Sequence, residues 1–108
     1  MAFKSDLDTM ILAVLRTESM HGYEIAKAIK QRSAEVLKVG EGQLYPALHI
    51  LERDGLVKAE WEQQLGKPAK KIYSITEAGA KKLAKQKKEW DSFVAGVGAI
   101  LNLEGGHV

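Results

Sequence analysis

Residues 40–57 constrain the fold more than any other part of the chain, because they pass from the period of a helix to the period of a strand. Leu44, Leu48 and Leu51 are separated by four and three residues, so they lie on one face of an α-helix. The Asp54-Gly55 pair then predicts the end of this helix, since glycine adopts the left-handed conformation that often follows a last helical turn. The pattern predicts a short helix that is anchored by one leucine stripe and followed directly by a strand.

The other face of this helix carries side chains that a core does not need. Most of them are aromatic or hydrogen-bonding, and the set comprises Tyr45, Pro46, His49, Ile50 and Arg53. A short helix of this kind is more typical of a recognition element than of a scaffold. Its start stays open. A start near Gly40 places Pro46 inside the helix and should distort it, whereas a start near Leu44 places Pro46 in the first turn, which proline tolerates.

Two further helices are predicted before this one. Ser5 is a suitable N-cap for the first, which runs to about Thr17. Its inward positions are apolar and comprise Leu7, Ile11, Val14 and Leu15. Residues 18–22 are expected to connect it to a second helix, from Tyr23 to about Gln31, with Ile25, Ala26 and Ile29 inward. Residues 36–39 are compatible with a short strand or with the end of an extended connector.

A hairpin and a long helix are predicted after residue 55. Val57, Ala59 and Trp61 alternate with charged residues, which indicates a half-buried strand. Residues 63–68 form a polar turn, and a second strand spans about 70–75 with Tyr73 in its inward register. Thr76 is a plausible N-cap for a last helix that runs to about residue 101. Its apolar residues recur at spacings of three, four and seven, as in a coiled-coil seam.

These elements predict a mainly α-helical fold with a small β-hairpin, which is a winged helix-turn-helix followed by a long C-terminal helix. The expected organisation is a DNA-binding domain over residues 1–75, the C-terminal helix over 76–102, and a flexible tail over 103–108. The chain of 108 residues lacks cysteine, an apolar run that could span a membrane and a signal peptide, so a cytoplasmic location is expected. No cofactor is expected.

The charge of the chain is uneven. Residues 67–88 contain eight lysines against a single acid, which gives +7, while the whole chain carries only +2. A local basic surface suits a polyanion, although a solvated helix face would have the same composition. In a winged helix, the third helix enters the DNA major groove and the wing lies along the phosphates. Base reading is therefore assigned to the outward face of this helix, with Gln43 and His49 as hydrogen-bonding groups. Tyr45 would contact a phosphate or a thymine methyl, and Arg53 a phosphate or guanine. Phosphate contacts are also assigned to Lys67, Lys70 and Lys71 near the tip of the wing.

Three motifs resemble the PadR family of bacterial transcriptional regulators. They are Met20-His21-Gly22-Tyr23-Glu24-Ile25, Gly42-Gln43-Leu44-Tyr45-Pro46-Ala47-Leu48 with Asp54-Gly55-Leu56-Val57, and Tyr73-Ser74-Ile75-Thr76-Glu77-Ala78-Gly79. The resemblance covers about residues 7–101. It implies a repressor that binds double-stranded DNA as a homodimer, with Tyr23 and Tyr45 in contact with DNA. The chain departs from the family at Gly40, where a side-chain cap is common, and at Ile50, where arginine is common.

The resemblance also assigns functions to the C-terminal helix. It implies a dimer interface formed by Leu83, Trp90, Val94, Val97 and Leu101. In short members of the family, a tryptophan on this helix stacks flat aromatic molecules at the dimer interface. The matching residue is Trp90, with Phe93 beside it, and the implied effector is a small aromatic or phenolic ligand. The alternative is that Trp90 is only part of the dimer core.

Other functional classes have less support in the residues. His21, His49 and His107 lack metal-ligand spacing, and His21 is expected to pack or cap before the second helix. No nucleophile, base and orienting acid form a catalytic pattern, which argues against an enzyme. The alternative from another class is a winged-helix module that binds proteins instead of specific DNA. Such modules tend to lose the basic wing and the polar helix face, and this chain keeps both.

Overall fold

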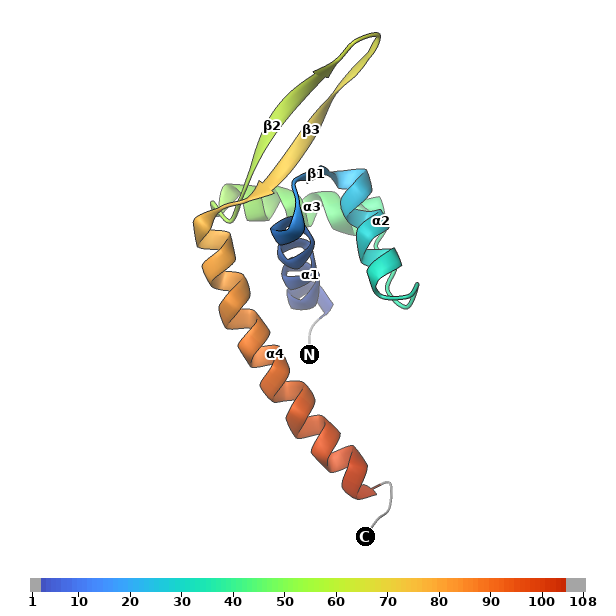
Figure 1. Ribbon diagram of the computed structural model, residues 1–108, viewed down its shortest axis with the longest axis vertical. Helices are drawn as coiled ribbons and strands as arrows, with labels where there is room; N and C mark the ends of the chain where they lie inside the picture. Colours follow the sequence, from blue (N-terminus) through green and yellow to red (C-terminus); the bar gives the residue numbers. More distant parts are fainter. Residues whose placement is uncertain (1–2, 105–108) are drawn as a thin grey trace.

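The computed structural model describes residues 3–104, with side chains for residues 6–102. In chain order the elements are α1 (Phe3–Thr17), β1 (Met20–His21), α2 (Gly22–Arg32), α3 (Glu41–Arg53), β2 (Val57–Gln64), β3 (Lys67–Ile75) and α4 (Glu77–Glu104). Figure 1 shows three short helices gathered at the centre, with the β2–β3 hairpin and α4 extending in opposite directions. The molecule is therefore elongated, with extents of 64 × 28 × 22 Å. The predicted winged helix-turn-helix with a long C-terminal helix is confirmed.

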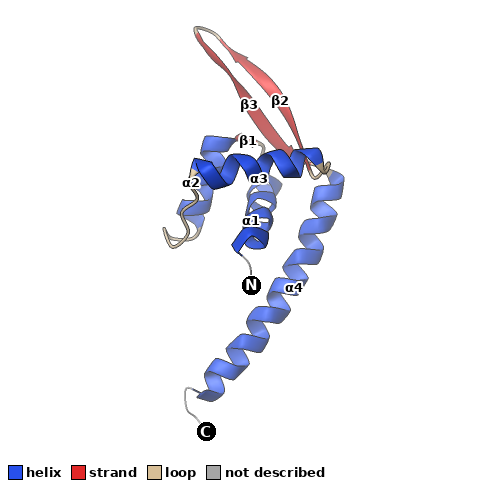
Figure 2. Ribbon diagram, turned by 180° about the vertical axis from the view of Figure 1, so that it is seen from behind, coloured by secondary structure: helices blue, strands red, loops and turns tan. Residues whose placement is uncertain are grey.

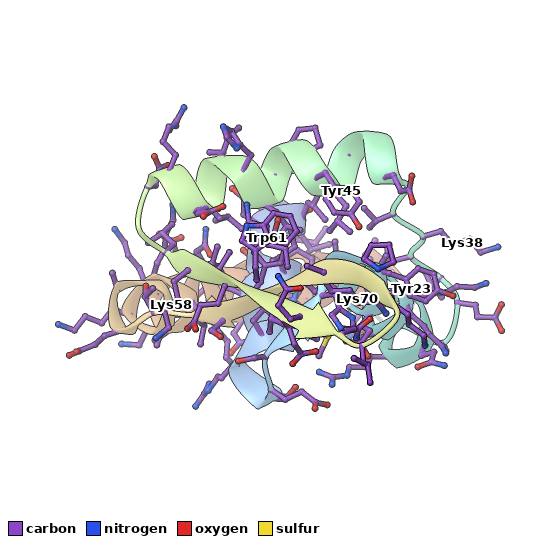
Figure 3. The ribbon with its side chains drawn as sticks, turned by 90° about the horizontal axis from the view of Figure 1, so that it is seen from above. Tyr23, Lys38, Tyr45, Lys58, Trp61 and Lys70 are labelled. Atoms are coloured by element: carbon purple, nitrogen blue, oxygen red, sulfur yellow. The ribbon has the colours of Figure 1, made fainter. Side chains whose placement is uncertain are left out.

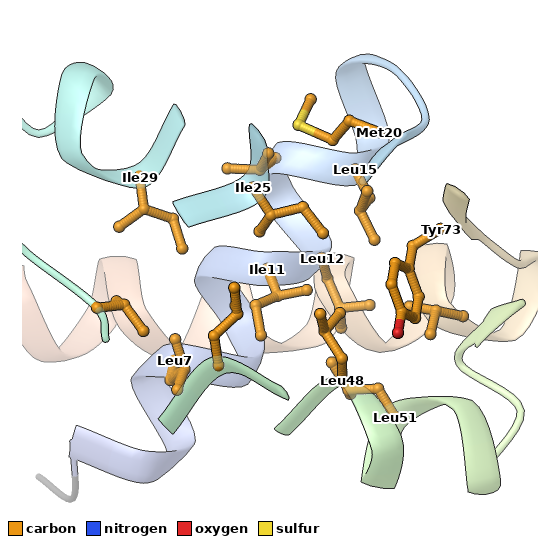
Figure 4. Packing of buried hydrophobic residues seen from close by; sticks show 14 of the residues in the cluster. Leu7, Ile11, Leu12, Leu15, Met20, Ile25, Ile29, Leu48, Leu51 and Tyr73 are labelled. Atoms are coloured by element: carbon orange, nitrogen blue, oxygen red, sulfur yellow. The ribbon is translucent and has the colours of Figure 1, made fainter. Parts of the chain in front are cut away.

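The core lies where α1, α2 and α3 meet the base of the hairpin (Figure 4). Leu44, Leu48 and Leu51 of α3 are 0–1% exposed, as their spacing predicts. Ile11 and Leu12 of α1 are fully buried between the other helices. Burial of a large aliphatic side chain contributes about 1.5–3 kcal/mol, so these five residues account for much of what holds α3 in place.

The start of α1 differs from the prediction. The helix begins at Phe3, so Ser5 lies within it instead of capping it. The side chain of Ser5 is outside the described part of the structure.

The segment predicted as a plain connection contains a short strand. Met20 and His21 form β1, which pairs antiparallel with Tyr73 and Ile72 of β3 and makes a three-stranded sheet in the order β1-β3-β2. Beside it, the hydroxyl groups of Ser19 and Ser74 are 2.7 Å apart. This third strand attaches the base of the hairpin to the start of α2. Residues 36–39, in contrast, form no strand and belong to an extended connector.

The helix α3 begins at Glu41, so the first of the two possible starts is correct. Gly40 is its N-cap and provides no side-chain hydrogen bond, which leaves the cap as weak as the sequence suggests. Pro46 lies inside the helix. Because proline has no N–H, the carbonyl of Gly42 loses its usual intrahelical donor, yet the helix continues to Arg53. Gly55 then takes a positive φ of 75° and turns the chain into β2.

The hairpin is longer and its turn shorter than predicted. The strands extend to Gln64 and from Lys67, which leaves a turn of Leu65 and Gly66, and Gly66 has a φ of 72°. Between the pairs Glu62–Lys70 and Gln64–Lys67, β3 has one residue more than β2. The resulting bulge contains Pro68, which cannot donate to a strand neighbour.

The helix α4 is fastened to the domain only by its first two turns. Thr76 caps it as predicted, since its Oγ1 accepts a hydrogen bond of 3.1 Å from the Gly79 N–H. Gly79 is required here, because a Cβ at this position would overlap the Leu56 carbonyl oxygen. Leu83 packs into the core, and the rest of α4 leaves the domain (Figure 2).

The C-terminal end of α4 also differs from the prediction. The helix runs to Glu104, so residues 103 and 104 are helical where a flexible tail was expected. The remainder of that tail lies outside the described residues. Among the helices of residues 3–104, none is long and apolar enough to cross a membrane.

Candidate nucleic-acid interface

The exposed face of α3 carries the residues that were assigned to base reading. The side chains of Gln43, His49 and Arg53 are exposed. Leucines on the opposite side anchor the helix, so this face is presented on a rigid element. Arg53 Nε lies 3.0 Å from Oδ1 of Asp54, while its side chain remains 66% exposed. An exposed pair of this kind contributes little, so the guanidinium stays available to another acceptor.

Tyr45 lies one turn before His49 on the same side of α3, and it packs against the start of α2. A Cβ on Gly22 would lie only 2.6–2.8 Å from three atoms of the Tyr45 ring and hydroxyl. The chain therefore needs glycine at position 22 to let the tyrosine approach. Tyr45 keeps 42% of its surface exposed, so it can fasten α3 to α2 and still contact a ligand. Tyr23, one residue after the glycine, is 71% exposed.

The start of α2 is stabilised by His21 and Glu24. Glu24 Oε1 accepts a hydrogen bond of 3.2 Å from the His21 backbone N–H and lies 2.8 Å from its Nδ1. This confirms the capping function that was expected for His21. An open groove of about 800 Å³ lies between α2 and the connector after it. Three lysines line this groove, Lys27, Lys30 and Lys38. These lysines extend the basic surface beyond the wing and were not singled out from the sequence.

An ion pair joins the wing to α3. Lys71 Nζ of β3 donates a hydrogen bond of 3.1 Å to Glu52 Oε1 of α3 and lies 5.5 Å from the centre of the Tyr73 ring. The hydrogen bond to Glu52 raises the pKa of Lys71 above its ordinary value of 10.5. Burial raises the pKa of Tyr73 above 10.0, against the opposing effect of the Lys71 ammonium. At neutral pH the lysine is therefore charged and the tyrosine neutral.

The three wing lysines consequently differ in their surroundings. Lys67 and Lys70 are exposed in the outer half of the hairpin. Lys71 lies closer to the base, pairs with Trp61 across the strands and is held by Glu52. It was predicted near the tip as a phosphate contact, but its ammonium already has an acceptor within the chain. Lys70 lies on the opposite face of β3, because neighbouring strand residues point to opposite sides.

The free length of α4 exposes an apolar stripe. Its members are 38–65% exposed and comprise Trp90, Phe93, Val94, Val97, Ile100 and Leu101. The rings of Trp90 and Phe93 have centroids 6.0 Å apart and planes tilted by 35°. Leu83, which was assigned to the same interface, is 4% exposed and belongs to the core of its own chain. It therefore has almost no surface to offer a partner.

Two residues at the wing were missed or misplaced by the sequence reasoning. Trp61 was placed on the inward face of its strand, but it is 67% exposed. Glu52 of α3 was not singled out from the sequence, yet it binds Lys71, which is 19 residues away in the chain. The alternation around Trp61 was a usable signal for its face, although it carries no information on where the core ends. Within residues 3–104, no group of three histidine or acidic side chains is placed to hold a metal ion.

Known proteins share this arrangement. A family model described as the transcriptional regulator PadR-like family matches residues 11–85. The negative transcriptional regulator PadR of Bacillus subtilis is 30% identical over 73 residues, which are 68% of this chain and 40% of that protein. The chain thus spans about two fifths of the length of several curated regulators that it matches.

Solved structures agree with the sequence comparison. A PadR family transcription regulator from Clostridium difficile has a TM-score of 0.73 and 29% identity, with 93% of this chain and 98% of that chain covered. Bacillus subtilis PadR in complex with operator DNA has a TM-score of 0.68 and 29% identity, with 74% and 45% covered. The family model includes the second half of α1, all of α2 and α3, the wing and the start of α4, and so this chain belongs to the PadR-like family of transcriptional regulators.

Proposed function

We propose that this protein is a sequence-specific DNA-binding repressor that acts as a homodimer and is released from DNA by a small aromatic effector. The observation that carries the proposal is the exposed face of α3 beside the basic wing. Gln43, His49 and Arg53 have the hydrogen-bonding groups that read base edges in a major groove, and Lys67 and Lys70 suit phosphates. The operator complex of the Bacillus subtilis relative supports DNA as the partner.

The homodimer is supported by the free part of α4. This helix has 28 residues and a length of about 40 Å, and nearly all of its described residues after Leu83 are exposed. A stripe of large apolar side chains on such a helix is covered most simply by the same stripe of a second copy. Two-fold symmetry would place two copies of α3 on half-sites about 34 Å apart, which is one turn of DNA.

The effector is supported by the aromatic pair on α4. Trp90 and Phe93 are each nearly half exposed, and both lie on the stripe that a second copy would approach. Indole and phenyl faces stack on flat aromatic molecules. A ligand between the two copies would change the separation of the α3 helices and so lower DNA affinity. Such coupling is typically about 1–3 kcal/mol. The repressor assignment is supported by the relative described as a negative regulator.

The DNA-binding part is tested by fluorescence anisotropy with labelled duplexes. One duplex carries the region upstream of the protein's own gene, and a second has the same composition in shuffled order. We expect the upstream duplex to bind more tightly and the affinity to fall with added salt, by a slope of about −0.9 for each phosphate contact. Equal binding to both duplexes, or to neither, would reject a sequence-specific regulator and favour the protein-interaction module.

The dimer and effector parts need separate measurements. Val94→Glu should convert the dimer to monomer in light-scattering chromatography. Lys85→Glu is the matched control, because Lys85 lies on another side of α4 than the stripe. This variant should leave the dimer intact. Trp90→Ala should abolish the response of DNA binding to planar aromatic probes. A dimer of Trp90→Ala that responds fully would leave Trp90 with a packing function only.

A further inference from the structure

The exposure of Trp61 is not explained by any function described so far. Its side chain is 67% exposed, although tryptophan is among the most costly residues to leave in water. It lies on β2 in the hairpin, whereas the apolar stripe of α4 extends from the other end of the molecule (Figure 1). The Trp61 ring thus belongs neither to the core nor to the surface that the proposed dimer would cover.

The strand register places this ring on the side of the wing that faces α3. Trp61 is paired with Lys71, so their side chains project from the same face of the sheet. Lys71 in turn binds Glu52 of α3. Figure 3 shows Trp61 between the hairpin and α3, on the same side of the molecule as Tyr45. Trp61 therefore lies between the two elements that would hold DNA.

The geometry of B-DNA determines what passes between a recognition helix and a wing. When a helix lies in the major groove and a wing reaches the neighbouring minor groove, one sugar-phosphate strand passes between them. A side chain between α3 and the wing faces that strand. We propose that Trp61 contacts this backbone strand, with its indole ring against deoxyribose and its Nε1–H donated to a phosphate oxygen. This assignment rests on the proposed DNA-binding function.

The charges beside Trp61 favour a neutral donor at this position. The ammonium of Lys71, its partner across the strands, is already bound to Glu52 at 3.1 Å. This ion pair has little net charge, so a phosphate between the wing and α3 needs another hydrogen-bond donor. The indole N–H is a donor only, and its ring covers apolar sugar carbons at the same time. The contact would position the backbone without reading sequence.

The first test uses the fluorescence of Trp61 in the full chain. Trp90→Phe leaves Trp61 as the only tryptophan and retains an apolar ring on α4. Quenching is measured with acrylamide, which is neutral and leaves the ionic strength unchanged. We expect saturating upstream duplex to remove most of the accessibility of Trp61 to acrylamide. Anisotropy verifies that the complex has formed. If the accessibility of Trp61 to acrylamide is unchanged in that complex, the proposal is overturned.

The second test separates this contact from the lysine contacts. Trp61→Ala should weaken DNA binding about 10-fold and Trp61→Phe about 3-fold, since phenylalanine keeps the ring but loses the N–H. Both variants should keep the salt slope of the parent, because no charge is removed. The assignment would be overturned if both variants bound DNA as tightly as the parent. It would also be overturned if they bound more weakly with a salt slope that lacked about one phosphate contact per subunit.

Failure of the proposed function would look different from failure of this inference. If the parent protein binds no duplex, the DNA-binding proposal fails before any variant is compared. If the parent binds and the Trp61 variants bind equally well, only the Trp61 assignment fails. Thermal unfolding of each variant controls for folding, and the fluorescence test needs no change at Trp61.

Discussion

The ion pair between Glu52 and Lys71 distinguishes two descriptions of the DNA interface, because they predict opposite effects of the same substitution. If Glu52 is merely an acid near a polyanion, Glu52→Gln should strengthen DNA binding. If Glu52 holds the wing against α3, the same change should weaken binding. The sheet favours the second description. β1 pairs with β3 at Ile72 and Tyr73, and the next residue outward, Lys71, joins the wing to α3.

The size of the effect follows from the exposure of the pair. Lys71 Nζ and Glu52 Oε1 are 3.1 Å apart, and both side chains are 34% exposed. Two charges about 4 Å apart attract by about 1 kcal/mol in water and about 4 kcal/mol at an effective dielectric constant near 20. Desolvation and side-chain entropy offset most of this attraction, and exposed pairs contribute about 0.2–1 kcal/mol. A partly covered pair should contribute about 1 kcal/mol, or about fivefold in the population of the attached wing.

We therefore expect Glu52→Gln to weaken binding of the upstream duplex by about two- to fivefold, as measured by anisotropy. Lys71→Ala should have a similar effect without changing the salt slope. Lys70→Ala is the matched control, because loss of one phosphate contact in each subunit should reduce the slope by about 0.9 per subunit, or about 1.8 for the dimer. The exchange Glu52→Lys with Lys71→Glu keeps the net charge and should restore much of the affinity.

Two results would refute this reasoning. Tighter binding by Glu52→Gln, with a steeper salt slope, would mean that the released Lys71 binds phosphate. A smaller slope for Lys71→Ala, equal to that of Lys70→Ala, would mean that Lys71 contacts phosphate already.

Three further predictions concern the stability of the fold. The free energy of unfolding should fall as the pH rises above about 10, because the native state holds the protons of Lys71 and Tyr73 more tightly than the unfolded chain does. Urea unfolding at several pH values checks this, and an unchanged free energy between pH 9 and 11 would contradict it. Gly22→Ala should destabilise by about 1–3 kcal/mol through overlap with the Tyr45 ring, and Tyr45→Ala in the same chain should recover much of the loss in thermal unfolding. Ala34→Gly should stabilise by about 0.5–1 kcal/mol, since Ala34 has a left-handed φ of 53°; a destabilised variant would show that the alanine side chain matters more.

The elements with a clear hydrophobic period were predictable from the sequence. Leu44, Leu48 and Leu51 are buried as their spacing predicts, and Thr76 caps α4. These features depend on neighbours within one or two turns, which a local pattern records. The PadR resemblance added the family, and the match over residues 11–85 confirms it.

The features that were missed depend on partners far away in the chain. β1 has only two residues and exists because β3, about 50 residues later, pairs with it. The start of α3 was undecided because proline prefers the first turn of a helix, whereas Pro46 lies further inside α3. The Leu44 N–H donates a hydrogen bond of 2.9 Å to the Gly40 carbonyl, so a helical turn forms before Pro46. Leu44 on this turn is fully buried, and such tertiary packing can outweigh a local preference.

The candidate site was predictable in part for the same reason. Gln43, His49 and Arg53 could be assigned to the exposed face of α3 because the leucines define the other face. The alternation of apolar and charged residues in β2 did not show at which residue the strand stops being buried. Val57 is 2% exposed and Trp61 is 67% exposed on the same face of the strand, because the helices lie beneath only the base of the hairpin.

The basic stretch of the sequence is divided by the fold. Its eight lysines fall on the wing and on α4, which extend in opposite directions from Thr76 (Figure 1). Lys71 is bound to Glu52, and Lys87 lies 3.1 Å from Asp91. The wing therefore presents two exposed lysines from this stretch besides the paired Lys71, and α4 carries the other five away from the α3 face. With a slope of about −0.9 per phosphate, the two exposed lysines on each wing of a dimer should together contribute about −4 to the salt dependence of binding. This is far less than if all eight lysines of the stretch in each subunit contacted phosphate. The net charge of a segment measures its affinity for DNA only after the fold has shown which charges share a surface.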